Sequence, residues 1–183
     1  KFCLAGNYAM QDYCREHGLP LKTSGKVIVS KNQLELKTLD ELYLRATANN
    51  APVSMIDEHE LASIEPHAKT YQRALYSPRT AVVDPKKIMR CLYDELQATG
   101  KVTFLLNTKF IRNQQQTAIT SQGKIHYKYC INAAGSFADQ IAHKFDLAKQ
   151  FKLIPFKGTY RKVKPAYAHI TNGNIYPVPN IHN

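Results

Sequence analysis

The chain has 183 residues, of which 44% are hydrophobic, and its formal net charge is +11. This length suits one domain, or a domain with part of another, and no apolar run approaches the roughly 18 residues that a membrane-spanning helix needs. The positive charge is compatible with nucleic acid, an anionic membrane surface or an acidic small molecule as partner, and charge alone does not choose among them.

The first fifty residues predict a helix, a strand and a second helix. The first helix runs to about His17, and a strand is expected over residues 26–29. Asn32 is placed to cap the second helix, with Glu35 three residues later as its partner in a capping box. We expect this second helix to end near residues 49–50.

The next fifty residues predict two further capped helices around a strand. Asp57 and Glu60 repeat the capping-box pattern, and residues 73–76 predict the strand. Asp84 and Pro85 are typical of the N-cap and first turn of a helix. Five apolar side chains of this last helix are expected to face the core, with Tyr93 as a further candidate: Ile88, Met89, Cys91, Leu92 and Leu96.

The following segment predicts strands and a cofactor-type turn. Residues 102–106 predict a strand, and residues 118–127 predict a hairpin whose turn contains Gly123. A further apolar strand over residues 129–132 leads into Ala133-Ala134-Gly135 and then a helix. Small residues between a strand and a helix let main-chain atoms approach a ligand closely, and a helix N-terminus offers N–H groups to an anion.

This turn, together with three other segments, resembles the D-amino-acid-oxidase-like flavoprotein superfamily, and most closely its L-2-hydroxyglutarate oxidase branch. The other segments are residues 80–85, 155–160 and 175–179, and the resemblance runs along nearly the whole chain. It implies an FAD-dependent oxidoreductase of mixed class, α/β with α+β. A partial, Rossmann-like FAD-binding half would be interleaved with a mixed-sheet substrate domain.

The resemblance also implies a division of the chain. Residues 1–78 and 151–183 would belong to the substrate domain, and residues 79–150 to the second part of the FAD-binding domain. The family cradles the FAD pyrophosphate with a Gly-x-Gly-x-x-Gly element, which does not occur in this sequence. We therefore expect this chain to be a central fragment of the parent enzyme. Alone, it would be inactive and would not bind FAD tightly.

Cofactor contacts are implied for two places. The main chain of Ala133, Ala134 and Gly135 would pack against the FAD diphosphate or ribose, with Asp139 helping to hold the turn. Without the resemblance, an ordinary strand-to-helix connection explains this segment equally well. The main chain of a residue in the strand at Phe110 or Ile111 would pair with the adenine, and the competing interpretation there is a plain core strand.

Substrate contacts are implied for Lys157, Tyr160 and Tyr176. Lys157, on an expected strand with Tyr160, would face the flavin ring and hold a substrate carboxylate or stabilise the reduced flavin. The family often has arginine here, whereas lysine offers a point charge rather than a bidentate fork. Tyr176 would lie on an edge strand near the pocket. The competing interpretations are a solvated lysine and a buried aromatic, and no catalytic base is assigned.

The implied reaction is oxidation of a small anionic 2-hydroxy acid, most closely L-2-hydroxyglutarate to 2-oxoglutarate, with hydride transfer to the flavin. Oxygen or a membrane quinone pool would accept the electrons. The expected location is the cytoplasm, with peripheral contact at the inner membrane left open.

Two other functions remain as alternatives. Within the superfamily, an amino-acid or glycerol-3-phosphate oxidoreductase shares the cofactor motifs. A basic nucleic-acid-binding module, motivated by the charge and by the aromatic and basic residues near Lys157, is the alternative of another class. We do not expect nucleic acid as the partner.

The four cysteines are widely spaced and form no Cys-x-x-Cys pair. This spacing favours neither a zinc site nor a disulfide framework, and it predicts buried free thiols. His59-Glu60 lacks the second histidine of a metalloprotease helix, so no metal is expected.

Overall fold

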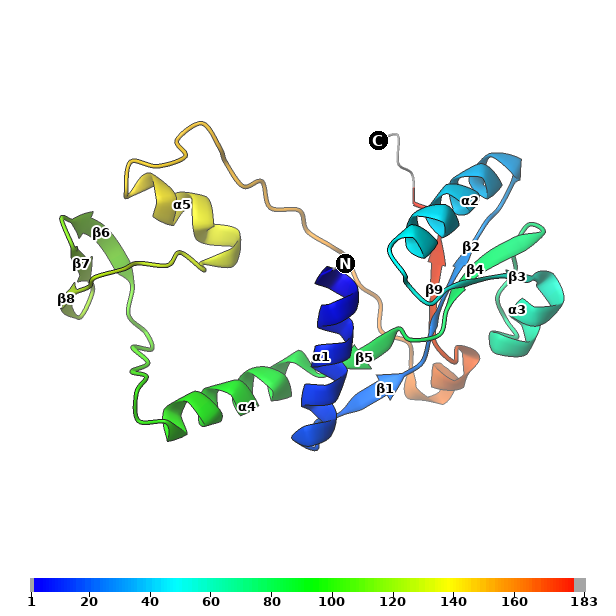
Figure 1. The fold of residues 1–183 in the computed structure, drawn as a ribbon, viewed down its shortest axis with the longest axis horizontal. Coiled ribbons are helices and arrows are strands. Elements are labelled where there is room, and N and C mark those ends of the chain that lie inside the picture. The colour runs from blue at the N-terminus through cyan, green and yellow to red at the C-terminus, as the bar shows by residue number, and fades with distance from the viewer. Residues whose placement is uncertain (1, 180–183) are drawn as a thin grey trace. The chain divides into compact units, whose positions relative to one another are not determined.

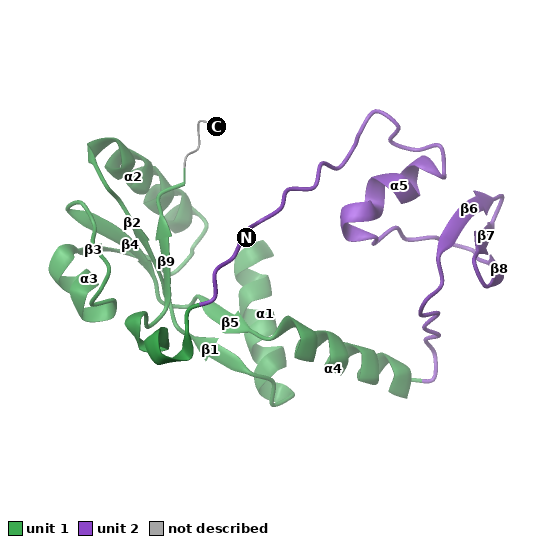
Figure 2. Ribbon diagram, turned by 180° about the vertical axis from the view of Figure 1, so that it is seen from behind, with its two compact units in different colours: residues 1–99, 163–183 green, residues 100–162 purple. Residues whose placement is uncertain are grey.

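The computed structural model describes residues 2–179, which divide into two compact units (Figures 1 and 2). Unit 1 comprises residues 1–99 and 163–183, and unit 2 comprises residues 100–162. The domain boundaries expected after residues 78 and 150 concern the complete fold of the family and stay predictions. No helix within residues 2–179 combines the length and the apolar character needed to cross a membrane.

Unit 1 is built on a four-stranded sheet in the order β3-β4-β2-β9 (Figure 1). The strands are β2 (Lys26–Val29), β3 (Ser54–Asp57), β4 (Arg73–Ser77) and β9 (Asn174–Pro177). β4 runs antiparallel to both β2 and β3, and β9 runs parallel to β2. The strands expected at 26–29 and 73–76 are therefore confirmed.

Helices cover the two faces of this sheet. α3 (Glu58–Ile64) packs its Leu61 into a cluster with Val27, Ile56 and Ala74. α2 (Gln33–Ala48) packs against the other face, where its buried Leu36 and Leu39 form a cluster with Leu75 of β4 and with Val178, just after β9. Because consecutive strand residues point to opposite faces, Ala74 and Leu75 enter different clusters.

Both predicted N-caps of these helices form. The Asn32 side chain accepts a hydrogen bond from the Glu35 backbone N–H at 3.0 Å. The Glu35 side chain accepts from the Lys31 N–H rather than from the Asn32 N–H, so the predicted capping box is only half formed here. Asp57 and Glu60 make the complete capping box, in which each side chain accepts from the other residue's N–H. These bonds satisfy donors that a helix start leaves free.

The rest of unit 1 is α1 (Phe2–Glu16), an antiparallel pair of β1 (Leu21–Thr23) and β5 (Ala81–Val83), α4 (Pro85–Ala98) and the 3-10 turn η2 (Pro165–Ile170).

The core-facing side of α4 was predicted correctly only in part, because Ile88 is buried while Cys91 and Leu92 are half-buried. The Asp84 side chain caps the helix as expected, accepting from Lys86 N–H and Lys87 N–H. Of the apolar residues expected in the core, however, only Ile88 is buried, and Met89 and Leu96 are exposed. The periodicity identified an amphipathic helix, but within the described residues little packs on its apolar side.

Unit 2 contains a three-stranded antiparallel meander and a short helix (Figure 2). The strands β6 (Phe110–Gln114), β7 (Thr117–Thr120) and β8 (Gly123–His126) pair in chain order, which confirms the predicted hairpin. The 3-10 turn η1 (Gly135–Phe137) follows and runs into α5 (Ala138–His143).

Two predicted strands of unit 2 are absent from the described structure. Residues 102–106 and 129–132 have no strand conformation, and Tyr129 and Ile131 are 80% and 89% exposed. A strand exists only where a neighbouring strand pairs its N–H and C=O groups. Neither segment has such a neighbour within residues 2–179, so apolar sequence alone does not hold it extended.

Candidate functional site

The turn at residues 133–135 is held by Asn132, which sequence reasoning did not assign. Its side-chain Nδ2 donates to the Ala138 carbonyl at 2.8 Å, and its Oδ1 accepts from the Ala134 N–H at 3.3 Å. Asparagine before a tight turn commonly bonds to the main chain in this way, so the residue type was an available signal.

The residues of this turn fit one wall of a nucleotide site. Gly135 has a φ of +55°, a left-handed conformation that favours glycine, and no other group lies within 4 Å of where its Cβ would be. The Ala133 and Gly135 positions are exposed. Open main chain with small side chains is what close approach by a cofactor requires, so the assignment of residues 133–135 stays a prediction with suitable local geometry.

Asp139, on the first turn of α5, binds the main chain of Leu153, which lies 14 residues later in unit 2. Its Oδ2 accepts the Leu153 N–H at 3.0 Å and its Oδ1 accepts the Gln140 N–H at 2.7 Å. The bond from Leu153, followed by that from Gln140, lowers the pKa of the Asp139 carboxyl below its ordinary value. Asp139 thus holds residue 153 against the start of α5.

Phe110 and Ile111 lie at the start of β6 and are tied to α5. Lys144, just after α5, directs its Nζ at the carbonyl oxygens of Phe110 (3.4 Å) and Ile111 (2.6 Å). The Phe110 ring stacks on Phe145 with a centroid separation of 5.5 Å and an interplanar angle of 2°. The carbonyl groups of both predicted adenine-pairing residues therefore already have a partner.

A small cavity lies behind the turn, with a volume of about 120 Å³. Its lining residues are Cys130, Asn132, Ala142, Phe145 and Leu147. Ligand pockets generally hold roughly 300 Å³ or more, so this cavity is too small for a flavin ring system. The described residues that line this cavity therefore do not form a pocket that could enclose a flavin.

The predicted substrate residues fall in different units. Lys157 and Tyr160 lie in an irregular segment of unit 2, and Tyr160 is 93% exposed. The strand expected there is absent, since no strand pairs with this segment in the described part of the chain. Tyr176 lies on β9 of unit 1, which is an edge strand as predicted. Its ring is 54% exposed, with Lys26 Nζ 5.8 Å from the ring centroid, so the buried-aromatic alternative is wrong.

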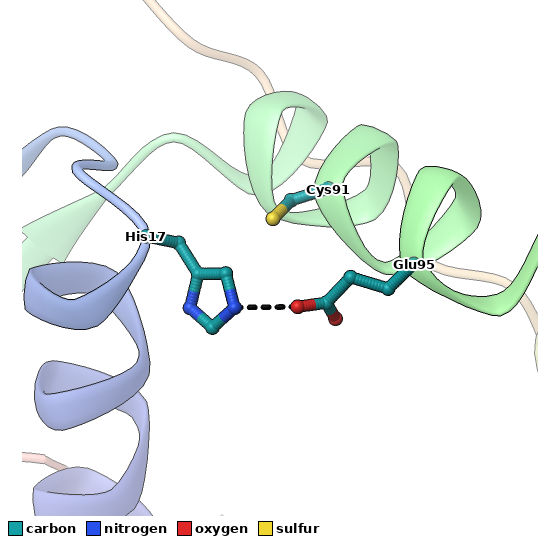
Figure 3. A group of neighbouring side chains, drawn as sticks. All are labelled: His17, Cys91 and Glu95. Atoms are coloured by element: carbon teal, nitrogen blue, oxygen red, sulfur yellow. Dashed lines mark ion pairs between the residues drawn. The ribbon is translucent and has the colours of Figure 1, made fainter. Parts of the chain in front are cut away.

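A second group of neighbouring polar side chains lies in unit 1 and was missed from sequence (Figure 3). His17 follows the end of α1, while Cys91 and Glu95 lie one turn apart on α4. His17 Nε2 is 2.5 Å from Glu95 Oε1, and the Tyr13 hydroxyl donates to Glu95 Oε2 at 2.9 Å. One ligand-type atom from each of His17, Cys91 and Glu95 lies within 4.8 Å of the others.

Hydrogen bonding shifts the pKa values in this group. The bond between His17 Nδ1 and the Tyr13 carbonyl raises the pKa of the imidazole, and Glu95 adds to the effect. A hydrogen bond with Cys91, together with desolvation and the bond to Glu95, raises the pKa of the Tyr13 hydroxyl. Tyr13 therefore remains a neutral donor at physiological pH.

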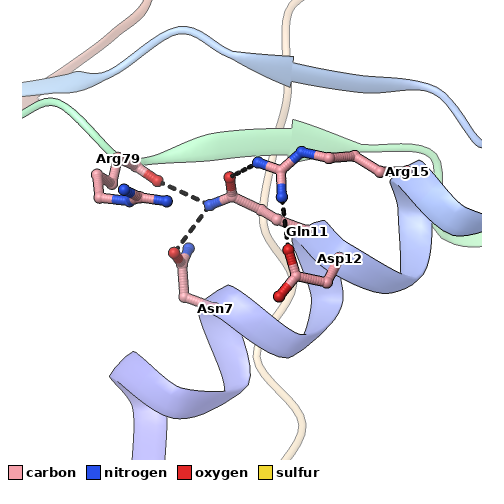
Figure 4. A network of polar contacts seen from close by, with 5 residues as sticks. All are labelled: Asn7, Gln11, Asp12, Arg15 and Arg79. Atoms are coloured by element: carbon pink, nitrogen blue, oxygen red, sulfur yellow. Dashed lines mark hydrogen bonds and ion pairs between the residues drawn. The ribbon is translucent and has the colours of Figure 1, made fainter.

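A polar network on the other side of α1 fixes this helix to the loop before β5 (Figure 4). Buried Gln11 donates from Nε2 to Asn7 Oδ1 at 2.8 Å and to the Arg79 carbonyl at 3.2 Å. Its Oε1 accepts from Arg15 at 3.0 Å, and Arg15 also pairs with Asp12 at 2.6 Å. Both polar atoms of this buried amide have hydrogen-bond partners, and these bonds position α1 and the His17 that follows it.

All four cysteines are free, as expected, but their burial differs from the prediction. Cys14 is buried, Cys91 is half-buried, and Cys3 and Cys130 are exposed. Cys3 lies on the first turn of α1, and Cys130 lies in the segment that forms no strand.

Comparison with known proteins identifies relatives along the full chain. An L-2-hydroxyglutarate dehydrogenase, mitochondrial, of Nematostella vectensis is 31% identical over 98% of this chain and 43% of its own length. The chain thus spans less than half the length of this relative. An L-α-glycerophosphate oxidase of Mycoplasma pneumoniae, solved with FAD bound, has a TM-score of 0.68 at 24% identity, covering 90% of this chain and 45% of that one.

A further solved structure, the L-proline dehydrogenase of P. horikoshii, has a TM-score of 0.69 at 19% identity and covers 78% of this chain and 40% of that one. These likenesses confirm the expected mixed fold class. The family model described as FAD dependent oxidoreductase matches residues 1–183. The chain therefore belongs to the family of FAD-dependent oxidoreductases.

Proposed function

We propose that this chain forms part of an oxidoreductase that converts a small anionic 2-hydroxy acid, L-2-hydroxyglutarate, to 2-oxoglutarate. The observation that carries the proposal is the 31% identity, over 98% of the chain, to a protein named L-2-hydroxyglutarate dehydrogenase. The substrate class goes beyond family membership, because the same fold serves amino acids and glycerol phosphate in other proteins.

The proposed contacts to the cofactor and to the substrate carboxylate both lie in unit 2. A bound flavin would supply the hydride-accepting chemistry for the substrate carbon that carries the hydroxyl group. In this chain, the turn at residues 133–135 lies against the cofactor, and Lys157 neutralises a substrate carboxylate. The formal charge of +11 is compatible with an acidic substrate.

The electron acceptor and the cellular location of the protein are parts of the same proposal. Oxygen or a membrane quinone takes the electrons from the reduced flavin, and the protein works in the cytoplasm or peripherally at the inner membrane. Turnover with a soluble quinone under nitrogen, compared with peroxide formation in air, separates the two acceptors.

The test uses the longest gene product that contains this chain, purified without added FAD. We expect flavin absorbance that bleaches on anaerobic addition of L-2-hydroxyglutarate and is unchanged by D-2-hydroxyglutarate. Bleaching with L-proline or glycerol 3-phosphate instead would move the protein to another substrate class within the family. A folded, colourless protein that FAD does not reconstitute, yet that binds nucleic acid with a steep salt dependence, would contradict the proposal.

A further inference from the structure

The group of His17, Cys91 and Glu95 supplies three different metal ligands from two helices. Cys91 and Glu95 are four residues apart on α4, a spacing that places both side chains on one face of the helix. His17, directly after α1, brings its imidazole to that face (Figure 3). Nitrogen, sulfur and carboxylate oxygen together form a donor set typical of zinc.

The imidazole of His17 is oriented as a ligand. Its Nδ1 lies 2.8 Å from the Tyr13 carbonyl oxygen, which can only accept, so Nδ1 carries the proton. This leaves Nε2 directed at Glu95 and Cys91. Metal-binding histidines regularly donate from their other ring nitrogen to a carbonyl or carboxylate in this way, which fixes the tautomer and the ring.

His17 Nε2 and Glu95 Oε1 lie 2.5 Å apart. Because an unprotonated ring nitrogen and a carboxylate oxygen are both acceptors, a positive group must lie between them. A proton fills this role in the absence of metal, and a metal ion that replaces it would gain the Cys91 thiolate as a third ligand. The Tyr13 hydroxyl, bonded to the second oxygen of Glu95, orients the carboxylate.

The geometry needs only modest adjustment. Tetrahedral zinc with bonds of about 2.0–2.3 Å holds its ligand atoms roughly 3.3–3.7 Å apart. The nitrogen–oxygen distance of 2.5 Å must therefore widen by about 1 Å, and the other separations, all within 4.8 Å, need to shorten by at most about 1 Å. His17 and Glu95 are exposed and Cys91 is half-buried, so surrounding residues do not enclose the two exposed side chains.

A catalytic cysteine–histidine arrangement does not explain the group. In that arrangement one ring nitrogen faces the thiol and the other faces the orienting carboxylate. Here the Tyr13 carbonyl occupies Nδ1 and the Glu95 carboxylate occupies Nε2. No ring nitrogen remains to take the proton of Cys91.

We propose that His17, Cys91 and Glu95 bind one zinc ion that fastens the end of α1 to α4. Three protein ligands leave a fourth position for water. Because the ligands come from segments far apart in the sequence, the lack of a Cys-x-x-Cys pair does not argue against this site.

The test is metal titration of the reduced, metal-free protein. We expect one equivalent of Zn²⁺ to bind and to raise the unfolding temperature, and one equivalent of Co²⁺ to give a thiolate-to-cobalt absorption band. Zn²⁺ should also protect Cys91 from alkylation, measured peptide by peptide in the unmodified sequence. That measurement needs no variant and therefore does not depend on how a variant folds.

Variants then assign the ligands. Cys91→Ser and His17→Asn should each weaken Zn²⁺ binding by about 10- to 100-fold or more, and Cys91→Ser should abolish the cobalt band. The matched controls Cys3→Ser and His67→Asn change exposed residues outside the group. Both should bind Zn²⁺ with the affinity of the unmodified protein. Absence of stoichiometric binding, or alkylation of Cys91 that zinc does not slow, would overturn the proposal.

Discussion

At the scale of single residues, Glu65 is the buried group on which the closing loop of unit 1 depends. It is 2% exposed, and its carboxylate accepts hydrogen bonds from the backbone N–H groups of Asn172 (3.0 Å) and Gly173. Glu65→Ala should lower the free energy of unfolding by about 2–4 kcal/mol, because both N–H groups lose a charged partner. Urea unfolding measures this change in the free energy of unfolding.

The matched control for this change is Glu41→Ala, on the exposed side of α2. It should alter the free energy of unfolding by no more than about 0.5 kcal/mol. Equal effects of the two substitutions would show that the Glu65 bonds add nothing to stability.

Two glycines of unit 1 should respond to alanine in opposite directions. Gly6 lies inside α1 with open space around its Cβ position, so Gly6→Ala should stabilise by about 0.5–1 kcal/mol. At Gly173 an added Cβ would overlap the carbonyl oxygen of Ser24, so Gly173→Ala should destabilise by about 1–3 kcal/mol. Thermal unfolding of both variants checks the opposite signs, and shifts in the same direction would contradict this packing.

Lys157 provides the residue-level test of the proposed substrate site. Lys157→Met should raise KM for L-2-hydroxyglutarate by about 10- to 100-fold, because one charged hydrogen bond to the carboxylate is lost. Lys152→Met, a second exposed lysine of unit 2, is the control and should leave KM unchanged. Steady-state kinetics on the longest gene product that contains this chain compares the two variants. An equal rise in KM for both would indicate a general effect of charge.

At the scale of elements, the bond between Asp139 and the Leu153 N–H makes the end of unit 2 sensitive to acid. The folded state lowers the pKa of Asp139 below its ordinary value of 3.8. Its stabilising effect is therefore complete above that value and is lost as the pH falls through the lower pKa of the folded state. The Leu153 amide resonance should move over this acid range in an NMR titration.

Asp139→Asn is the control, because its side chain has no charge to lose in acid. The Leu153 amide should then keep one position from pH 7 to 3. Movement of this resonance in the variant as large as in the original protein would assign the titration to another group.

Local signals in the sequence predicted the elements that local bonds create. Asn32, Asp57 and Asp84 each cap a helix through bonds to N–H groups two or three residues later, so the pattern contains its own partners. The hairpin around Gly123 is equally local. These predictions needed no knowledge of the rest of the fold.

Elements whose partners are distant were predicted less well. Residues 129–132 and the segment at Lys157 have apolar or alternating patterns typical of strands, yet no neighbouring strand pairs with them within residues 2–179. The group at His17 was missed for a related reason, because its other members lie on α4 and no spacing rule links them. The turn at 133–135 was located by its small residues, whereas Asn132, which holds it, was passed over.

At the scale of the whole molecule, burial is unequal between the two units. Every fully buried apolar side chain among the described residues lies in unit 1, from Cys14 to Val178. We expect amides of β2 and β4 to exchange with deuterium orders of magnitude more slowly than amides of β6 to β8. Hydrogen-exchange mass spectrometry makes the comparison, and equal protection would contradict this difference in stability.

The parallel pairing of β9 with β2 has a consequence for biosynthesis. Asn174 on β9 donates to the Ser24 side chain, 150 residues earlier in the sequence. At a translation rate of roughly 5–20 residues per second, the free edge of β2 leaves the ribosome about 7 to 30 seconds before its partner. Throughout that interval the nascent sheet offers unpaired N–H and C=O groups to any passing strand, so this edge is where a chaperone would have to act.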